Sequence, residues 1–152
     1  MNKYAIIGNP VDHSLSPTIQ AQFAKQIGLS MSYEKILAPL KGFTVAANNF
    51  VSSGALGFNI TVPFKVEAYN LVDEYTLNAK TAGAVNTIKV ENGTLYGENT
   101  DGIGLVNDLC HNLQQIIRGK DILILGAGGT TQGILLPLLK CQPKRILVAN
   151  RT

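Results

Sequence analysis

The strongest constraint on the fold is a glycine-rich segment near the carboxyl end of the chain. The apolar run at residues 122–125 leads directly into GAGGTTQG at residues 126–133, and an apolar segment continues to about residue 139. Such an apolar run is typical of a strand buried on both faces, and glycines before a helix let the backbone approach a pyrophosphate. We therefore predict the opening of a dinucleotide-binding unit. The alternative is a tight turn without a ligand, since Thr131 stands where the third glycine is usual and the next small residue is Gly133.

The end of the following strand indicates which dinucleotide fits. Arg145–Ala149 is predicted to form this strand, and Asn150-Arg151-Thr152 follows it. Enzymes that bind NAD usually carry an Asp or Glu there, which holds the ribose 2′-hydroxyl. This chain has no carboxylate at that place, and the planar guanidinium of Arg151 suits a 2′-phosphate. The pattern favours NADP, and the alternative is that Arg151 is a solvated residue after a strand.

Strand and helix patterns alternate over the first hundred residues. Ser16-Pro17 indicates a helix start with Ser16 as its N-cap, and Asn92-Gly93 between two β-prone runs indicates a hairpin. The alternation predicts an α/β fold on a largely parallel sheet with the hairpin at one edge. We expect strands at residues 3–8, 32–37, 56–61, 85–90 and 94–97, and helices at residues 16–27, 43–51, 64–71, 77–82 and 101–115.

Composition removes several classes of function. The net charge is only +3 and basic residues form no run, so nothing supports nucleic-acid binding. No apolar run approaches the roughly 18 residues of a membrane span. Cys110 and Cys141 lack metal or redox spacing, which predicts free thiols in a cytoplasmic protein and no metal site.

Polar side chains gather near the predicted strand ends and turns. In a parallel α/β sheet, ligands bind outside the carboxyl ends of the strands. Hydroxyls, an amide, an ammonium and a carboxylate together suit a small polyhydroxylated acid. Each residue also has a purely structural explanation, such as a helix cap, a hairpin contact or a lysine stem lying on an aromatic ring. The candidates are Ser14, Ser16, Thr61, Lys65, Asn86 and Asp101.

Six stretches together resemble the shikimate dehydrogenases. They are GNPVDHSLSP, GFNITVPFK, AGAVNT, GENTDGIG, GAGGTTQG and NRT, in the order and spacing of that family. The resemblance covers all 152 residues. It implies a substrate-binding α/β domain followed by the first βαβ unit of a Rossmann NADP-binding domain. The implied reaction is the reversible NADP-linked reduction of 3-dehydroshikimate to shikimate, on the route to chorismate and the aromatic amino acids.

The resemblance also implies a role for each candidate. Ser14 and Ser16 would bind the substrate carboxylate, and Thr61, Asn86 and Asp101 would hold the ring hydroxyls. Lys65 would be the catalytic group with Asp101 as its partner. An ammonium at that place can stabilise charge on the reacting oxygen and donate the proton. The residues implied for the cofactor are Gly126, Ala127, Gly128, Gly129 and Thr130 at the pyrophosphate, and Asn150, Arg151 and Thr152 at the 2′-phosphate.

The length of the chain leads to further expectations. We expect a substrate domain at residues 1–100, a connector helix at 101–118 and a truncated NADP-binding domain at 119–152. A complete dinucleotide-binding fold has two βαβαβ halves, so this chain alone is expected to be inactive and to self-associate through uncovered surfaces. Two alternatives stay open, namely a quinate/shikimate dehydrogenase and a non-catalytic module that binds shikimate.

Overall fold

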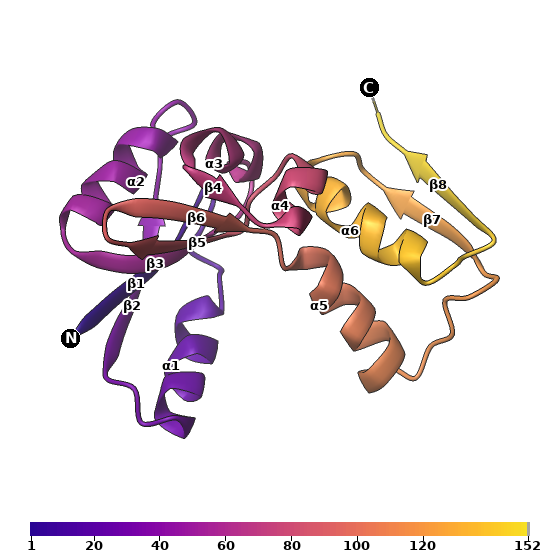
Figure 1. Cartoon of the computed structure of the whole chain (residues 1–152), viewed down its shortest axis with the longest axis horizontal. Helices are drawn as coiled ribbons and strands as arrows, with labels where there is room; N and C mark the ends of the chain where they lie inside the picture. The colour runs from indigo at the N-terminus through magenta and orange to yellow at the C-terminus, as the bar shows by residue number, and fades with distance from the viewer. Residues whose placement is uncertain (152) are drawn as a thin grey trace.

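The computed structural model describes residues 1–151, and the predicted cofactor residue Thr152 lies outside the described residues. A six-stranded sheet forms the larger part, in the order β2-β1-β3-β5-β6-β4 (Figure 1). Strands β1, β2 and β3 run parallel, β5 is antiparallel to both β3 and β6, and β4 is parallel to β6. This agrees with the predicted mostly parallel sheet. The strands are β1 (Asn2–Gly8), β2 (Met31–Leu37), β3 (Ala55–Ile60), β4 (Glu74–Tyr75), β5 (Thr87–Glu91) and β6 (Thr94–Glu98).

Helices cover this sheet unevenly. The buried core lies where α2 and α3 pack on the sheet, with Phe43 and Phe64 stacked at 5.2 Å between ring centroids. Alternate residues of β1 and β3 point into this core, because successive side chains of a strand face opposite sides. Helix α1 contacts β1 and β2 (Figure 1). The bounds are α1 (Ser16–Gln26), α2 (Phe43–Ser52), α3 (Lys65–Leu71) and α4 (Leu77–Ala82).

The start of α1 differs from the prediction. Ser16 is the first helical residue, Leu15 occupies the N-cap position, and no side chain caps the helix there. Instead, the Ser16 backbone N–H donates to Ser14 Oγ at 3.2 Å. The prediction of Ser16 as the N-cap was therefore wrong, and its hydroxyl is available for other contacts.

The connector is shorter than predicted. Helix α5 (Asp101–Asn107) passes into a single π-helical segment, η1 (Asp108–Asn112), so helix ends three residues before the expected residue 115. The widened turn is visible in the bond from Leu113 N–H to Asp108 O at 2.9 Å. Gln114 then adopts a left-handed conformation with φ of 51°, which stops the helix.

The last part is a small parallel pair of strands beside two helices (Figure 1). Strands β7 (Asp121–Leu125) and β8 (Arg145–Ala149) pair in register, and α6 (Gly129–Lys140) connects them. The prediction that the β7 run is buried on both faces was wrong. Leu123 is 63% exposed and Leu125 is 79% exposed, because helices cover only one side of this pair within residues 1–151.

Helix α6 contacts both α4 and α5 and so joins the two parts of the chain. The contact needs a glycine at position 133, because a Cβ there would lie 2.5 Å from Asn99 Oδ1. The small residue that the sequence carries at Gly133 thus serves close helix packing. None of the helices in the described part of the chain is both long and apolar enough to cross a membrane.

Candidate active site

Lys65 and Asp101 form the centre of the candidate site. Each is the first residue of its helix, α3 and α5 respectively, so the fold brings two helix starts together. Lys65 Nζ lies 2.7 Å from Asp101 Oδ2, and the two side chains are only 12% and 17% exposed. The short distance and low exposure indicate a charge-assisted hydrogen bond with little solvent screening. The N-terminus of α5 also favours the negative charge of the carboxylate.

Asn86 holds the other oxygen of the same carboxylate. It lies just before β5, and its amide nitrogen donates to Asp101 Oδ1 at 2.8 Å and to Thr100 Oγ1 at 3.0 Å. Its amide oxygen accepts from the Thr100 backbone N–H at 3.0 Å. Both amide hydrogens of Asn86 are therefore in use, so its direct effect in this structure is to orient Asp101.

The glycine loop contacts Lys65 from the other side. Lys65 Nζ donates to Thr130 Oγ1 at 3.0 Å. Gly129 lies so close that a Cβ there would be 3.1 Å from Lys65 Cβ. Lys65 and the loop line a cavity of about 230 Å³ together with Val62 and Pro63. Two of the three ammonium hydrogens are thus assigned, and the third is available to a ligand.

The loop itself suits a phosphate group. Gly128 precedes α6, whose first turn presents unpaired backbone N–H groups and a positive dipole end. The hydroxyl of the buried Thr131, at the usual position of a third glycine, donates to Gly126 O at 2.9 Å and closes the loop. Gly126, Gly128, Gly129 and Thr130 border the 230 Å³ cavity, so the residues present fit the pyrophosphate of a dinucleotide.

Two further cofactor candidates lie on the same edge. Asn150 and Arg151 follow β8, which is parallel to β7, and Gly126 N–H donates to Ala149 O at 2.7 Å. This bond brings the end of β8 beside the start of the glycine loop. Arg151 is exposed, and so its guanidinium can reach a ligand from solvent.

The hydroxyl candidates follow β1 and β3, with Ser14 in the loop after β1, Ser16 at the start of α1 and Thr61 directly after β3. Ser14 Oγ donates to Ser16 Oγ at 3.1 Å, so the two hydroxyls form a pair. Thr61 follows β3, where its backbone N–H donates to Ile7 O at 3.0 Å and its methyl group lies against Gly8. The three hydroxyls thus lie in the segments that follow these two strands, and their roles in binding stay predictions.

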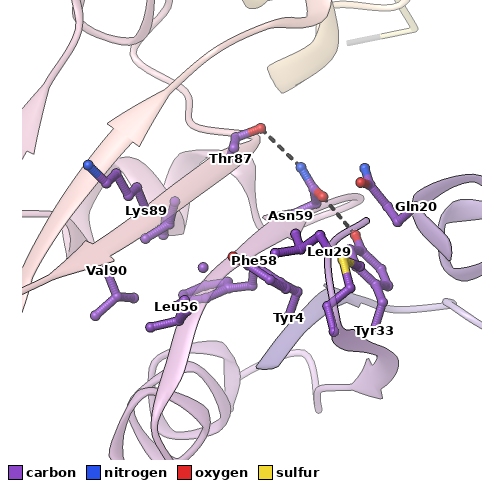
Figure 2. Close-up of a pocket in the computed structure, with 13 residues that line it drawn as sticks. Tyr4, Gln20, Leu29, Tyr33, Leu56, Phe58, Asn59, Thr87, Lys89 and Val90 are labelled. Atoms are coloured by element: carbon purple, nitrogen blue, oxygen red, sulfur yellow. Dashed lines mark hydrogen bonds between the residues drawn. The ribbon is translucent and has the colours of Figure 1, made fainter. Parts of the chain in front are cut away.

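Sequence reasoning missed three hydrogen-bonded residues near these groups, namely Tyr33, Asn59 and Thr87. Tyr33 on β2 donates its hydroxyl to Asn59 Oδ1 on β3 at 2.7 Å, and Asn59 Nδ2 donates to Thr87 Oγ1 at 3.0 Å. Figure 2 shows Asn59 between the other two, in a cavity of about 500 Å³ on the sheet face away from the main core. Asn59 had a signal, because it stands two residues before Thr61 and so shares its face of the strand. Tyr33 had none.

Burial perturbs the Tyr33 hydroxyl. Loss of solvent raises the pKa of this phenol to about 12, and a hydrogen bond with the Ser16 side chain opposes the rise. The phenol is therefore neutral at ordinary pH and acts as a donor to Asn59.

The chain is similar in sequence and in structure to known shikimate dehydrogenases. Residues 6–88 match the shikimate dehydrogenase substrate binding domain. An NADP⁺ shikimate dehydrogenase of Ruthia magnifica is 62% identical over 152 residues, which are all of this chain and 57% of the relative. A structure of shikimate dehydrogenase from Aquifex aeolicus has a TM-score of 0.92 at 38% identity, and covers all of this chain and 56% of its own. One from Thermus thermophilus, in complex with NADP(H) and shikimate, has a TM-score of 0.89 at 33% identity, with 100% and 57% covered.

The fold and the site thus define an α/β protein in which polar side chains lie beside a glycine-rich loop of the dinucleotide-binding type. The chain belongs to the shikimate dehydrogenase family, because the family match covers more than half of its residues. It spans about half the length of the curated relatives that it matches.

Proposed function

We propose that this chain carries the shikimate-binding site and the opening of the NADP-binding site of an NADP-dependent shikimate dehydrogenase. The observation that carries the proposal is the Lys65–Asp101 pair, 2.7 Å apart and in contact with the glycine loop through Thr130. A structural ion pair has no need of a phosphate-binding loop against its ammonium. A reduction that delivers a hydride and a proton to one carbonyl needs both groups side by side.

The substrate would bind by its carboxylate and its hydroxyls. Ser14 and Ser16 offer paired hydroxyls to the carboxylate. Thr61, Asn86 and Asp101 would hold the ring hydroxyls, and Asn86 would exchange one of its present bonds for such a contact. The polyhydroxylated acid that this set suits is shikimate, the ligand bound in the Thermus thermophilus relative.

Lys65 would serve as the proton donor and acceptor. NADPH supplies the hydride when it is bound. Negative charge then develops on the carbonyl oxygen of 3-dehydroshikimate, and the Lys65 ammonium stabilises this charge and donates its proton. Asp101 keeps the ammonium oriented. In the oxidation of shikimate, the same lysine accepts the hydroxyl proton.

The cofactor would lie along the glycine loop. Gly126, Ala127, Gly128, Gly129 and Thr130 would hold the pyrophosphate at the N-terminus of α6. Asn150, Arg151 and Thr152 would hold the 2′-phosphate that distinguishes NADP from NAD. The absence of an acidic side chain at the end of β8 supports this preference.

The proposal includes a division of the chain and a location. Residues 1–100 would be the substrate domain, 101–118 the connector and 119–152 part of the NADP-binding domain. A cytoplasmic location is supported by the free thiols Cys110 and Cys141. The chain alone would bind shikimate without turnover, because β7 and β8 form only two strands of the complete dinucleotide fold.

Two measurements test the proposal. Calorimetric titration of the 152-residue chain should show binding of shikimate, and weaker binding of quinate. A chimera in which this chain replaces the matching part of the Ruthia magnifica relative should reduce NADP⁺ with shikimate. In that chimera, Lys65→Ala should lower turnover by about 100-fold or more while shikimate affinity changes little.

Each outcome separates the candidate functions. Near-normal turnover of the Lys65→Ala chimera would refute the catalytic role of this lysine. Shikimate binding with an inactive chimera would favour a non-catalytic module, and equal use of quinate and NAD would favour the quinate/shikimate enzyme. Failure of the chain to bind shikimate would refute the proposed substrate.

A further inference from the structure

A continuous series of side-chain hydrogen bonds crosses the sheet beneath the candidate site. It begins at Tyr33 on β2, passes over β3 and β5, and ends at the carboxylate of Asp101 in α5. Tyr33, Asn59 and Thr87 form its central part (Figure 2). The members in order are Tyr33, Asn59, Thr87, Asn86 and Asp101, and the Ser16 side chain lies near the Tyr33 hydroxyl.

Every donor in this series points the same way. The only hydrogen of the Tyr33 hydroxyl goes to Asn59 Oδ1. Asn59 then donates to Thr87 Oγ1, and Thr87 donates to Asn86 Oδ1 at 3.0 Å. A carboxylate at the far end accepts without donating, which fixes the direction and polarises the bonds before it.

Tyr33 is the residue that decides how Asn59 is oriented. The Asn59 amide nitrogen has two acceptors, Thr87 Oγ1 at 3.0 Å and Asn86 O at 3.4 Å. The hydroxyl of Tyr33 is the only hydrogen-bond donor to the Asn59 amide oxygen within residues 1–151. By contrast, Asn86 is anchored independently, because the Thr100 backbone N–H donates to its oxygen.

We propose that Tyr33 is a positioning residue for substrate recognition, which orients the Asn59 amide next to the Ser16 hydroxyl at the carboxylate end of the site. The proposal rests on the proposed function, in which Ser16 binds the substrate carboxylate. In this role, Tyr33 affects the affinity for the substrate and takes no part in proton transfer. The Thr100 contact shields Asn86, and with it Asp101 and Lys65, from a change at Tyr33.

The chain offers a matched control. Tyr4 lies directly opposite Tyr33 in the parallel β1–β2 pair and lines the same cavity. Within the described residues its hydroxyl makes no hydrogen bond. Removing either hydroxyl leaves an aromatic ring in the same cavity, so Tyr33→Phe and Tyr4→Phe differ only in the network. Superposable backbone amide spectra of the two variants would establish that both retain the fold.

The first experiment needs no ligand. Side-chain amide signals of the chain are recorded by nuclear magnetic resonance for the unchanged protein and for both variants. Tyr33→Phe should shift the Asn59 amide signals and leave those of Asn86 nearly unchanged, and Tyr4→Phe should move neither. Unshifted Asn59 signals in Tyr33→Phe would overturn the positioning role, whatever the protein binds.

The second experiment measures affinity for shikimate and for its methyl ester, which lacks the carboxylate charge. Tyr33→Phe should weaken shikimate binding about 5-fold, in line with one net hydrogen bond, and leave ester binding unchanged. Tyr4→Phe should leave the binding of both ligands unchanged, because its hydroxyl takes no part in the network. Equal losses for both ligands, or an equal loss of shikimate affinity in Tyr4→Phe, would overturn the proposal. If the unchanged chain binds no shikimate, the proposed function fails and the carboxylate role fails with it, while the amide spectra still decide the network.

Discussion

A single added methyl group at Gly133 should destabilise the protein through Asn99. The Asn99 side chain is 2% exposed and holds two backbone groups, with Nδ2 donating to Ala84 O at 3.0 Å and Oδ1 accepting from Asp101 N–H at 3.1 Å. A Cβ at Gly133 would lie 2.5 Å from Oδ1 and 2.8 Å from Nδ2. Because Asn99 is buried on all sides, its side chain cannot move away into solvent. Gly133→Ala therefore breaks these hydrogen bonds or displaces α6 outward.

The size of the effect follows from three contributions. Overpacking of a tight contact costs about 2 kcal/mol. Loss of two hydrogen bonds costs about 1 kcal/mol each. Against this, alanine is about 1 kcal/mol better than glycine inside a helix. The expected net loss for Gly133→Ala is about 3 kcal/mol in the free energy of unfolding, measured by urea denaturation.

Gly104→Ala is the matched control. Gly104 lies within α5, and a Cβ there would meet no atom within 4 Å. The same substitution should therefore stabilise the protein by up to about 1 kcal/mol through helix propensity alone. The two variants should change stability in opposite directions. If Gly133→Ala were as stable as Gly104→Ala, the close packing of α6 on Asn99 would be refuted.

Three other predictions test the site and the uncovered surfaces. Asp101→Asn should lower the free energy of unfolding by about 2 kcal/mol in urea denaturation, because it leaves a largely buried ammonium with a weaker partner. Glu91→Gln, at an exposed ion pair, should cost under about 0.5 kcal/mol. The fold favours the neutral form of Tyr33. Its contribution to the free energy of unfolding is therefore complete below pH 10.0 and is lost as the pH rises toward about 12. After solvent screening, the pKa shift of Tyr33 contributes about 1 kcal/mol to the free energy of unfolding. Tyr33→Phe should remove this loss of stability at alkaline pH, as measured by unfolding on both sides of pH 10.0. The chain should self-associate through the exposed face of β7. The double variant with Leu123→Lys and Leu125→Lys should be more monomeric in analytical ultracentrifugation. A wild-type chain that is monomeric at high concentration would contradict this prediction.

Local signals placed the elements that have strong boundaries. The sequence predicted the bounds of Leu77–Ala82 and Arg145–Ala149 as the structure has them. The helix Leu77–Ala82 ends at Gly83, whose φ of 59° suits glycine, and its N-cap Thr76 accepts from Ala79 N–H. Where capping was weaker, the ends moved by one or two residues. The π-helical turn of the connector had no local signal, because it depends on hydrogen bonds that form at the helix end.

Burial was harder to predict than secondary structure. An apolar run indicates that a strand prefers burial, but it does not say how many faces the rest of the fold covers. Ile122 and Ile124 point toward the helices, while Leu123 and Leu125 on the other side are exposed. The hydrogen-bond network at Tyr33 was hidden for a related reason, because it depends on the register of three strands from distant parts of the chain.

The segment around Lys65 and the glycine loop look separate in the sequence but are in contact in the structure. The segment with Lys65 pointed to a reactive lysine, and the glycine loop pointed to a phosphate, some sixty residues later along the chain. In the structure Gly129 lies against the Lys65 stem, and Thr130 accepts a hydrogen bond from its ammonium. A side chain at position 129 would therefore disturb Lys65 even if no phosphate were ever bound. Gly129 therefore allows two close approaches, that of a ligand and that of the Lys65 side chain. The phosphate-binding pattern in the sequence explains only the approach of the ligand.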